Sequence, residues 1–388
     1  MASYAPSKLI LVFFLVSYSS TSSLALNKTT NIGVIIDEGS RAGKEQKTAI
    51  EIAVQKLNSG SKNHKLAIQF KNSKGDPLEA ASSASDLIDK ENVQVIVGTD
   101  TWEETTVVAK IGQRAKIPVI SLTAHTFQSQ SRLQWPFLVQ MTNVDMHDEI
   151  KCIASIVQSY NWKRTIVVYE DNMFGDGYIG VSLLSEALQQ IGSLIEQTVA
   201  VPHFTSSFDP TETIRENLAN VVTTKQSRVF IVLKSSLQDA SRVFEEANKL
   251  GLMGRDSVWI LGDSFSSFLD SLDPSVFQHI QGALGVKTYY YDNSTQFLDF
   301  KSNFKTSFRS KYPEEDKSEP GIYAIRAYNS IETISLALDR LGNLKYTDGK
   351  KLLDTILSTN FSSLTGRIDF QGENQSEVFQ LVNIIGKS

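Results

Sequence analysis

The chain is poor in the residues that build disulfides and metal sites. Its 388 residues include one cysteine, Cys152, and five histidines. One cysteine cannot form a disulfide within the chain or a multi-cysteine zinc site. No H-x-x-x-H or H-x-H spacing occurs among the histidines, which are His64, His125, His147, His203 and His279. We therefore expect no metal and no cofactor, and interpret Cys152 as a buried structural thiol.

An excess of positive charge is also absent. The formal net charge is −5 at pH 7, whereas nucleic-acid binding requires a basic patch or stripe. We expect no nucleic-acid partner. Apart from residues 9–18, the chain lacks long apolar runs. That run is shorter than the roughly 20 residues that span a bilayer, so we expect no transmembrane segment in this chain.

The run 9–18 has the features of an export signal. Lys8 precedes it, and small residues follow it as far as Ser-Leu-Ala at 23–25, which fits a signal-peptidase site. Residues 1–25 are therefore predicted to be a signal peptide, rather than a disordered or core segment. Four N-x-S/T acceptor sites agree with secretion, and they begin at Asn27, Asn293, Asn360 and Asn374. We expect a secreted, extracellular glycoprotein.

Strands and helices alternate in two consecutive stretches of the chain. The first predicts strands over 31–37, 66–70, 93–97 and 118–120, with helices over 46–57, 77–88 and 102–114. The second predicts strands over 165–169, 194–201, 228–233 and 257–261, with helices over 145–160, 177–190, 209–222 and 236–250. This order implies parallel, doubly wound sheets with right-handed crossovers. Two such stretches predict two lobes, each with its own sheet.

The segment between the two stretches, residues 136–143, is apolar and strand-like. A flexible linker would be rich in Gly, Ser or Pro, so a tight hinge is expected. After the second stretch, the pattern predicts a strand over 282–286, a long helix over 323–341 and terminal strands over 366–370 and 378–385.

One glycine motif favours a dinucleotide-binding enzyme. Gly175, Gly177 and Gly180 match G-x-G-x-x-G near a strand-helix junction. However, the first glycine comes several residues after the strand, and no acidic residue ends the next strand to hold a ribose hydroxyl. The motif therefore lacks its required context.

A second motif favours a hydrolase. Gly-Asp-Ser-Phe at 262–265 resembles the nucleophile block of GDSL-type esterases, with Ser264 as nucleophile. The last histidine is His279, and no aspartate lies three residues before it, so the serine lacks an activating base. A secreted GDSL-like serine hydrolase using Ser264 stays the alternative function.

Residues 161–177 carry the most information about function. Trp162 leads into the β-branched run 165–168, an acidic turn at 170–172 and a glycine-flanked helix start. The turn follows the carboxyl end of a strand, where open α/β sheets bind ligands. This unit resembles the second-lobe opening of extracellular amino-acid receptor domains, and it is most similar to the amino-terminal domain of plant glutamate-receptor-like channels.

The resemblance extends from residue 31 to residue 388 and also includes the segments 31–35, 120–121, 259–263, 323–328, 366–368 and 379–386. It implies an α/β, bilobed type I periplasmic-binding-protein-like fold, with two doubly wound parallel sheets joined by a multi-strand hinge. The implied first lobe comprises residues 26–141 and 264–342. The implied second lobe comprises residues 142–263 and 343–388.

The resemblance also implies a ligand site between the lobes. In amino-acid-binding relatives, hydroxyls and backbone amides after the fourth strand hold the ligand carboxylate, and an acid across the cleft holds the ammonium. The candidate ligand-binding residues here are Ser121, Thr123, Tyr169, Glu170, Asp171, Phe174, Asp263 and Tyr323. Two departures reduce the number of hydroxyls: Thr-Ala-His stands at 123–125 where plant relatives tend to have Ser-Ala-Thr, and Phe174 replaces a common tyrosine. Ordinary strand-end caps in an empty cleft therefore stay an open alternative.

The resemblance implies a non-catalytic receptor ectodomain. In the plant channels, the segment that matches residues 382–388 is followed by an agonist-binding module and pore helices, and this chain stops there. Expected partners are a small amino-acid-like or peptide ligand, a second copy of the chain, or full-length receptor subunits at the plasma membrane. A natural short form, a truncated gene product and a subunit fragment all fit the sequence.

Overall fold

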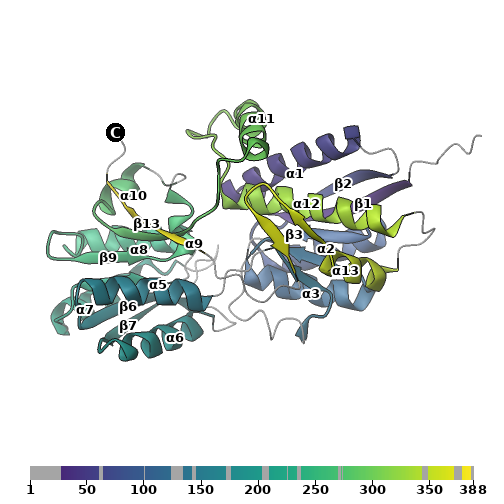
Figure 1. Cartoon of the computed structure of the whole chain (residues 1–388). Coiled ribbons are helices and arrows are strands. Elements are labelled where there is room, and N and C mark those ends of the chain that lie inside the picture. Colours follow the sequence, from purple (N-terminus) through teal and green to yellow (C-terminus); the bar gives the residue numbers. More distant parts are fainter. Residues whose placement is uncertain are drawn as a thin grey trace, which may run out of the picture.

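A computed structural model describes thirteen parts of the chain, which are residues 28–60, 64–99, 101–123, 134–141, 146–171, 176–202, 209–224, 226–233, 237–269, 272, 274–342, 348–370 and 378–385. The predicted signal peptide, Phe174 and the acceptor sites Asn27 and Asn374 lie outside these ranges. Figure 1 shows the described elements in two lobes, each built around one sheet. None of the described helices is both long and apolar enough to cross a membrane.

The first lobe contains a five-stranded parallel sheet. Its strand order is β2-β1-β3-β4-β5. The strands are β1 (Lys28–Ile36), β2 (His64–Asn72), β3 (Val95–Gly98), β4 (Val119–Ser121) and β5 (Leu138–Gln140). The four predicted strands are therefore confirmed. The predicted hinge segment contributes β5, which is a full member of this sheet.

Helices cover both faces of the first sheet. They are α1 (Arg41–Gly60), α2 (Pro77–Asp89), α3 (Trp102–Ala115), α11 (Thr295–Lys311), α12 (Ile322–Leu341) and α13 (Gly349–Leu357). Val34 packs in the core cluster that contains α1, α11, α12 and α13, whereas the adjacent Ile35 packs in the cluster that contains α2 and α3. Successive side chains of a strand point to opposite faces, so β1 is apolar throughout its centre.

The second lobe contains a six-stranded sheet with the order β13-β10-β9-β8-β6-β7. Its strands are β6 (Arg164–Asp171), β7 (Leu194–Pro202), β8 (Val229–Val232), β9 (Val258–Leu261), β10 (Leu284–Thr288) and β13 (Phe379–Asn383). All pairs are parallel except β10 with β13. The helices are α5 (Met146–Ser159), α6 (Asp176–Gln190), α7 (Thr211–Thr224), α8 (Leu237–Lys249), α9 (Asp263–Ser266) and α10 (Pro274–His279).

The chain passes between the lobes at different points from those predicted. We expected it to return to the first lobe at residue 264, but β10 pairs with β9 in the second sheet. We expected it to leave the first lobe at residue 343, but Leu352, Ile356 and Phe370 belong to the first-lobe core. The second crossing therefore follows Thr288, and the third follows Phe370. Burial of apolar side chains, which strand order alone does not reveal, decides both positions.

A two-stranded antiparallel hairpin separates α13 from the third crossing. It comprises β11 (Asn360–Ser362) and β12 (Arg367–Asp369). The strand predicted over 366–370 is therefore a hairpin strand, and it does not join either main sheet.

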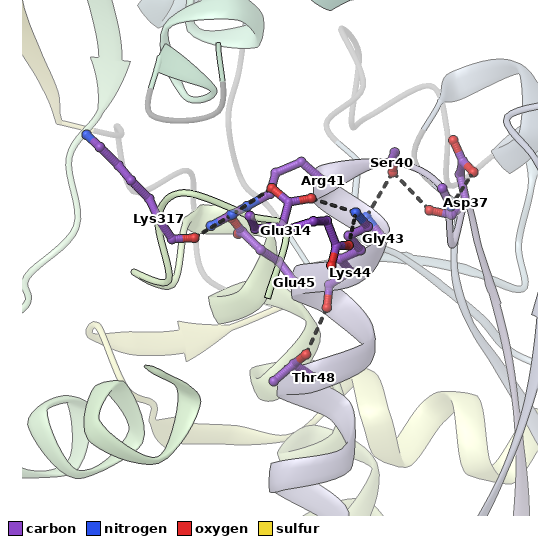
Figure 2. Close-up of polar contacts among 11 residues, drawn as sticks. Asp37, Ser40, Arg41, Gly43, Lys44, Glu45, Thr48, Glu314 and Lys317 are labelled. Atoms are coloured by element: carbon purple, nitrogen blue, oxygen red, sulfur yellow. Dashed lines mark hydrogen bonds and ion pairs between the residues drawn. The ribbon is translucent and has the colours of Figure 1, made fainter. Parts of the chain in front are cut away.

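Ion pairs hold the segment between α11 and α12 against the start of α1 (Figure 2). Arg41 donates hydrogen bonds to Glu45 at 2.9 Å and to the Lys317 carbonyl at 2.7 Å. Glu45 is buried, and it also accepts a hydrogen bond from the backbone N–H of Gly321 at 2.9 Å. A carboxylate at a helix N-terminus satisfies an orphan donor and complements the helix dipole. These contacts fix the start of α12, whose first turn carries Tyr323 and whose second turn begins with Arg326.

Candidate functional site

An aromatic contact joins the two lobes at the candidate site. Tyr323, in the first turn of α12, stacks on Phe268, which follows α9 in the second lobe. The ring centroids are 4.6 Å apart, and the planes differ by 17°. Offset-stacked rings at this separation attract each other. The predicted residue Tyr323 is thus a direct interlobe contact.

Ser121 is the last residue of β4. Its side chain is fully buried, and its hydroxyl lies 3.2 Å from the Thr105 hydroxyl on α3. Thr105 in turn lies 2.7 Å from the buried Thr99 hydroxyl. This chain of hydroxyls ties β3, β4 and α3 together and keeps the Ser121 side chain away from solvent. Thr123, two residues later, is partly exposed and donates its backbone N–H to Ser121 Oγ at 3.3 Å.

Asp263 lies where β9 ends and α9 begins, as the sequence predicts. Its Oδ1 atom accepts hydrogen bonds from the Thr288 backbone N–H at 2.6 Å and from the Ser267 hydroxyl at 2.9 Å. Its own backbone N–H donates to Glu149 at 2.8 Å. The carboxylate is therefore held in one orientation, and Oδ2 has no partner among the described residues.

Tyr169, Glu170 and Asp171 form the carboxyl end of β6. Tyr169 and Glu170 are partly exposed and Asp171 is exposed. Burial raises the pKa of the Tyr169 hydroxyl, and the nearby Asp171 carboxylate adds to the effect, so this phenol stays protonated at neutral pH. The three residues lie at the edge of the second sheet that a ligand in an open α/β fold would contact.

The surroundings of Gly177 give a structural reason for one glycine of the G-x-G-x-x-G motif. A Cβ atom at this position would lie 2.2 Å from the Glu170 carbonyl oxygen and 2.6 Å from the Tyr169 ring. The glycine therefore permits α6 to start against the end of β6. Close packing of helix on strand is a sufficient physical reason for this glycine.

The structure also reveals a cavity at the hinge that the sequence reasoning missed. It has a volume of about 340 Å³, and residues of all three chain crossings line it. Arg326 and Asn329 from α12 reach it, although both are buried. A signal was present in the sequence, since Arg326 interrupts an apolar helical pattern at a position where a surface residue is not expected.

One Asp-His-Ser cluster resembles a hydrolase triad in its order. His64 Nδ1 lies 3.2 Å from Asp339, and its Nε2 lies 3.3 Å from the Ser335 hydroxyl. Ser335 points from the buried face of α12 and is 3% exposed. A nucleophile must be reachable by its substrate, so this cluster fits a structural link between β2 and α12. Among the described residues, no group of three acidic, histidine or cysteine side chains suits a metal ion.

The acceptor sites for glycan differ in their surroundings. Asn293 is exposed in the segment between β10 and α11. Asn360 is partly buried, and its amide nitrogen donates to Asp369 at 3.0 Å while its oxygen accepts from Arg367 at 2.9 Å. The Asn360 amide is therefore engaged within the hairpin, whereas Asn293 lies in an exposed segment.

Comparison with known proteins agrees with this architecture. The model of the family described as "Receptor family ligand binding region" matches residues 45–387. "Glutamate receptor 2.2" of Arabidopsis thaliana is 29% identical over 404 residues, covering 98% of this chain and 42% of the relative. "Glutamate receptor 2.7" of the same organism is 28% identical over 391 residues, covering 94% and 40%. The chain thus spans about two fifths of the length of these relatives.

Solved structures of low sequence identity share the fold. A solute binding protein from Rhodopseudomonas palustris in complex with 4-hydroxybenzoate has a TM-score of 0.72 at 17% identity, with 89% of each chain covered. A branched-chain amino acid transporter substrate binding protein from Streptococcus pneumoniae in complex with isoleucine has a TM-score of 0.65 at 20% identity, covering 89% of this chain and 92% of that chain. Both are binding proteins of transporters, and their structural similarity to this chain confirms the expected periplasmic-binding-protein-like fold class. With a family match over most of its length and this two-lobed architecture, the chain belongs to the receptor family of ligand-binding regions and is similar to the amino-terminal part of plant glutamate receptors.

Proposed function

We propose that the chain is a non-catalytic extracellular domain that binds a small amino-acid-like ligand between its lobes. The observation that carries this proposal is the position of Asp263. Its carboxylate stands at the carboxyl end of β9, is oriented through Oδ1 by the Thr288 backbone, and keeps Oδ2 available. Such a group suits the ammonium of an amino acid, because charge-assisted hydrogen bonds are the stronger ones.

The opposite side of the ligand would be held by the first lobe. Thr123, which follows β4, is partly exposed, and its backbone N–H donates to the hydroxyl of the buried Ser121. Tyr323 and the end of β6, with Tyr169, Glu170 and Asp171, would complete the walls. Isoleucine and 4-hydroxybenzoate are bound by the structural neighbours, and these ligands define the size class to test first.

Calorimetry with a panel of amino acids tests the site. Asp263→Asn should weaken the binding of an amine-bearing ligand by roughly 1.5 to 3 kcal/mol, about 10- to 150-fold, because a charge-assisted hydrogen bond becomes a neutral one. Ser121→Ala is the matched control within the same pocket region. It should lower the melting temperature and leave the ligand affinity nearly unchanged, since the Ser121 hydroxyl is buried.

Unchanged affinity in Asp263→Asn, with folding verified by thermal melting, would remove the ligand from this position. A hydrolase using Ser264 gains no support from the family or the neighbours. We therefore expect the wild-type protein and Ser264→Ala to show the same background rate of ester hydrolysis.

We further propose that the protein is exported and that it assembles, as a homodimer or with receptor subunits. The family, the predicted signal peptide and the exposed Asn293 support export. Mass spectrometry of the secreted protein should find Leu26 as the first residue and glycan on Asn293. Sedimentation of the same sample reports the assembly state. Recovery of an intact, unglycosylated protein that begins at Met1 would contradict export. A protein that sediments as a monomer and does not bind receptor ectodomains would contradict assembly.

A further inference from the structure

The hinge cavity combines features that none of the predicted site residues provides. Its walls include Met141 from the first crossing, residues 288–291 from the second, and Phe370 with Val378 from the third. Helix α12 and the β11–β12 hairpin supply the remainder. A molecule in this cavity would contact every segment that joins the lobes.

Arg326 is a buried cation in this cavity without an acidic partner. The residue is 7% exposed. Its contacts are a long hydrogen bond of 3.5 Å to the Leu122 carbonyl and the face of the Tyr323 ring, 5.8 Å from the guanidinium carbon. No carboxylate among the described residues pairs with it. Buried charges in proteins are normally paired, because an unpaired one loses its hydration without compensation.

The other charged residues of the cavity do not neutralise Arg326. Asp369 lines the cavity, but it lies 3.6 Å from the Arg367 guanidinium and also accepts a hydrogen bond from Asn360. Arg367 and Asp369 thus form a pair of zero net charge. Among the described residues that line the cavity, one positive charge is therefore uncompensated, at Arg326.

Two neutral polar groups of the cavity also lack partners. Asn329 Oδ1 and Thr288 Oγ1 are buried and accept no hydrogen bond from the described residues, and both residues are about 5% exposed. Unsatisfied buried polar atoms are uncommon in folded proteins. The Thr288 hydroxyl can donate to an oxyanion, whereas the Asn329 amide oxygen can only accept a hydrogen bond.

One part of the remaining wall is apolar. Ile322, Ile325, Met141 and Phe370 face the same space. A volume of about 340 Å³ is at the lower end of the range of roughly 300 to 1,000 Å³ for small-molecule sites. The cavity is thus suited to a compact molecule with one anionic end and one apolar end.

We propose that the hinge cavity is a binding site for a small organic monocarboxylate, separate from the interlobe site. The carboxylate would pair with the Arg326 guanidinium and accept a hydrogen bond from the Thr288 hydroxyl. The apolar part of the ligand would contact Ile322 and Ile325. Arginine is well suited to this task because its planar fork can bind a carboxylate through two N–H groups.

The cavity is connected to both halves of the interlobe site. Arg326 donates to the carbonyl of Leu122, which lies between Ser121 and Thr123. The Thr288 backbone N–H donates to the Asp263 carboxylate. A carboxylate bound at the hinge therefore restrains the groups that face a ligand from both lobes. By linkage, a hinge ligand and an interlobe ligand alter each other's affinity by the same factor.

Calorimetry and thermal melting with benzoate, isovalerate and benzamide test the proposal on the full mature chain. Benzamide is the neutral analogue of benzoate with nearly the same shape. We expect at least one carboxylate to bind with 1:1 stoichiometry and to raise the melting temperature, and we expect benzamide not to do so. Absence of binding by both carboxylates, or equal binding of benzoate and benzamide, overturns the proposal.

Variants then locate the bound carboxylate. Arg326→Gln should weaken its binding by at least about 10-fold, and it should raise the melting temperature of the free protein, because an unpaired buried charge is removed. Thr288→Val, which keeps the shape of the side chain, should weaken binding by about 2- to 10-fold. Arg255→Gln, an exposed arginine in the second lobe, serves as the control and should change neither quantity.

Benzoate binding that survives Arg326→Gln in a folded protein would contradict the assignment, as would unchanged binding in Thr288→Val if the first variant does not fold. Asp263→Asn separates the two sites. If it abolishes benzoate binding as completely as Arg326→Gln, the cavity is part of the interlobe site and the claim of a second site is wrong.

Discussion

At the scale of single residues, the sequence predicts where candidate polar side chains stand, whereas their burial and pairing depend on the folded structure. Asp263 and Thr123 follow strands of opposite lobes, and strand ends of parallel sheets are predictable from apolar runs. The burial of Ser121 was not predictable, because it depends on Thr105 of α3 lying against the end of β4. Arg326 was visible as a cation in an apolar helix face, but its pairing could be judged only from the folded structure.

Three charged residues at the α7–α8 contact show how a buried carboxylate stabilises the second lobe. Burial opposes ionisation of Glu246, but hydrogen bonds from Arg215 at 2.7 Å and Lys249 at 2.5 Å outweigh it. The pKa of Glu246 is therefore held below its ordinary value of 4.5. A lowered pKa in the folded state adds stability above the unfolded-state pKa, and this stability is lost as the pH falls through the folded-state pKa.

Glu246→Gln should accordingly reduce the free energy of unfolding at pH 7 by roughly 1.5 to 3 kcal/mol. The difference from the wild-type protein should shrink below about pH 4.5, where the carboxylate of the unfolded chain becomes protonated. Urea unfolding across this pH range measures it. Glu212→Gln is the control, since Glu212 pairs with the same Arg215 but is exposed, and surface pairs contribute about 0 to 1 kcal/mol. Equal losses in both variants at every pH would contradict the account.

At the scale of helices and strands, apolar periodicity predicts most of the long elements, but helix α11 was not among those predicted. Its buried face consists of Phe297, Phe300, Phe304 and Phe308, which recur at helical spacing after the capping residue Ser294. This pattern could have been recognised in the sequence. The position of β10 in the second sheet could not be predicted from the sequence, because a short apolar strand can pair with either sheet.

Phe304 provides the test of α11 as an element of the first-lobe core. Its side chain is fully buried and packs between Phe300 and Phe308. Phe304→Ala should destabilise the protein by about 3 to 5 kcal/mol, through lost apolar burial and a cavity. Leu298→Ala, on the exposed face of the same helix, should change stability by less than about 0.5 kcal/mol. Calorimetric melting of both variants decides whether the phenylalanine face holds the helix in place.

At the scale of the whole molecule, the order of strands and helices predicted two lobes, and the structure confirms two separate sheets. The family resemblance suggested that the chain crosses between the lobes more than once. The positions of those crossings depended on the packing of Leu352, Ile356 and Phe370 in the first lobe, which periodicity cannot assign to one core or the other. From the three crossings and the Phe268–Tyr323 contact, we expect the lobes to move relative to each other by hinge motion.

The most direct test of the central claim, a ligand held between two lobes, is small-angle X-ray scattering with and without the amino acid that binds most tightly in calorimetry. The account predicts that the radius of gyration of the wild-type protein falls when the ligand is saturating, because a ligand that contacts both lobes favours their approach. At the same ligand concentration, the radius of Asp263→Asn should stay at the ligand-free value. A wild-type radius that does not change at saturation would contradict the account.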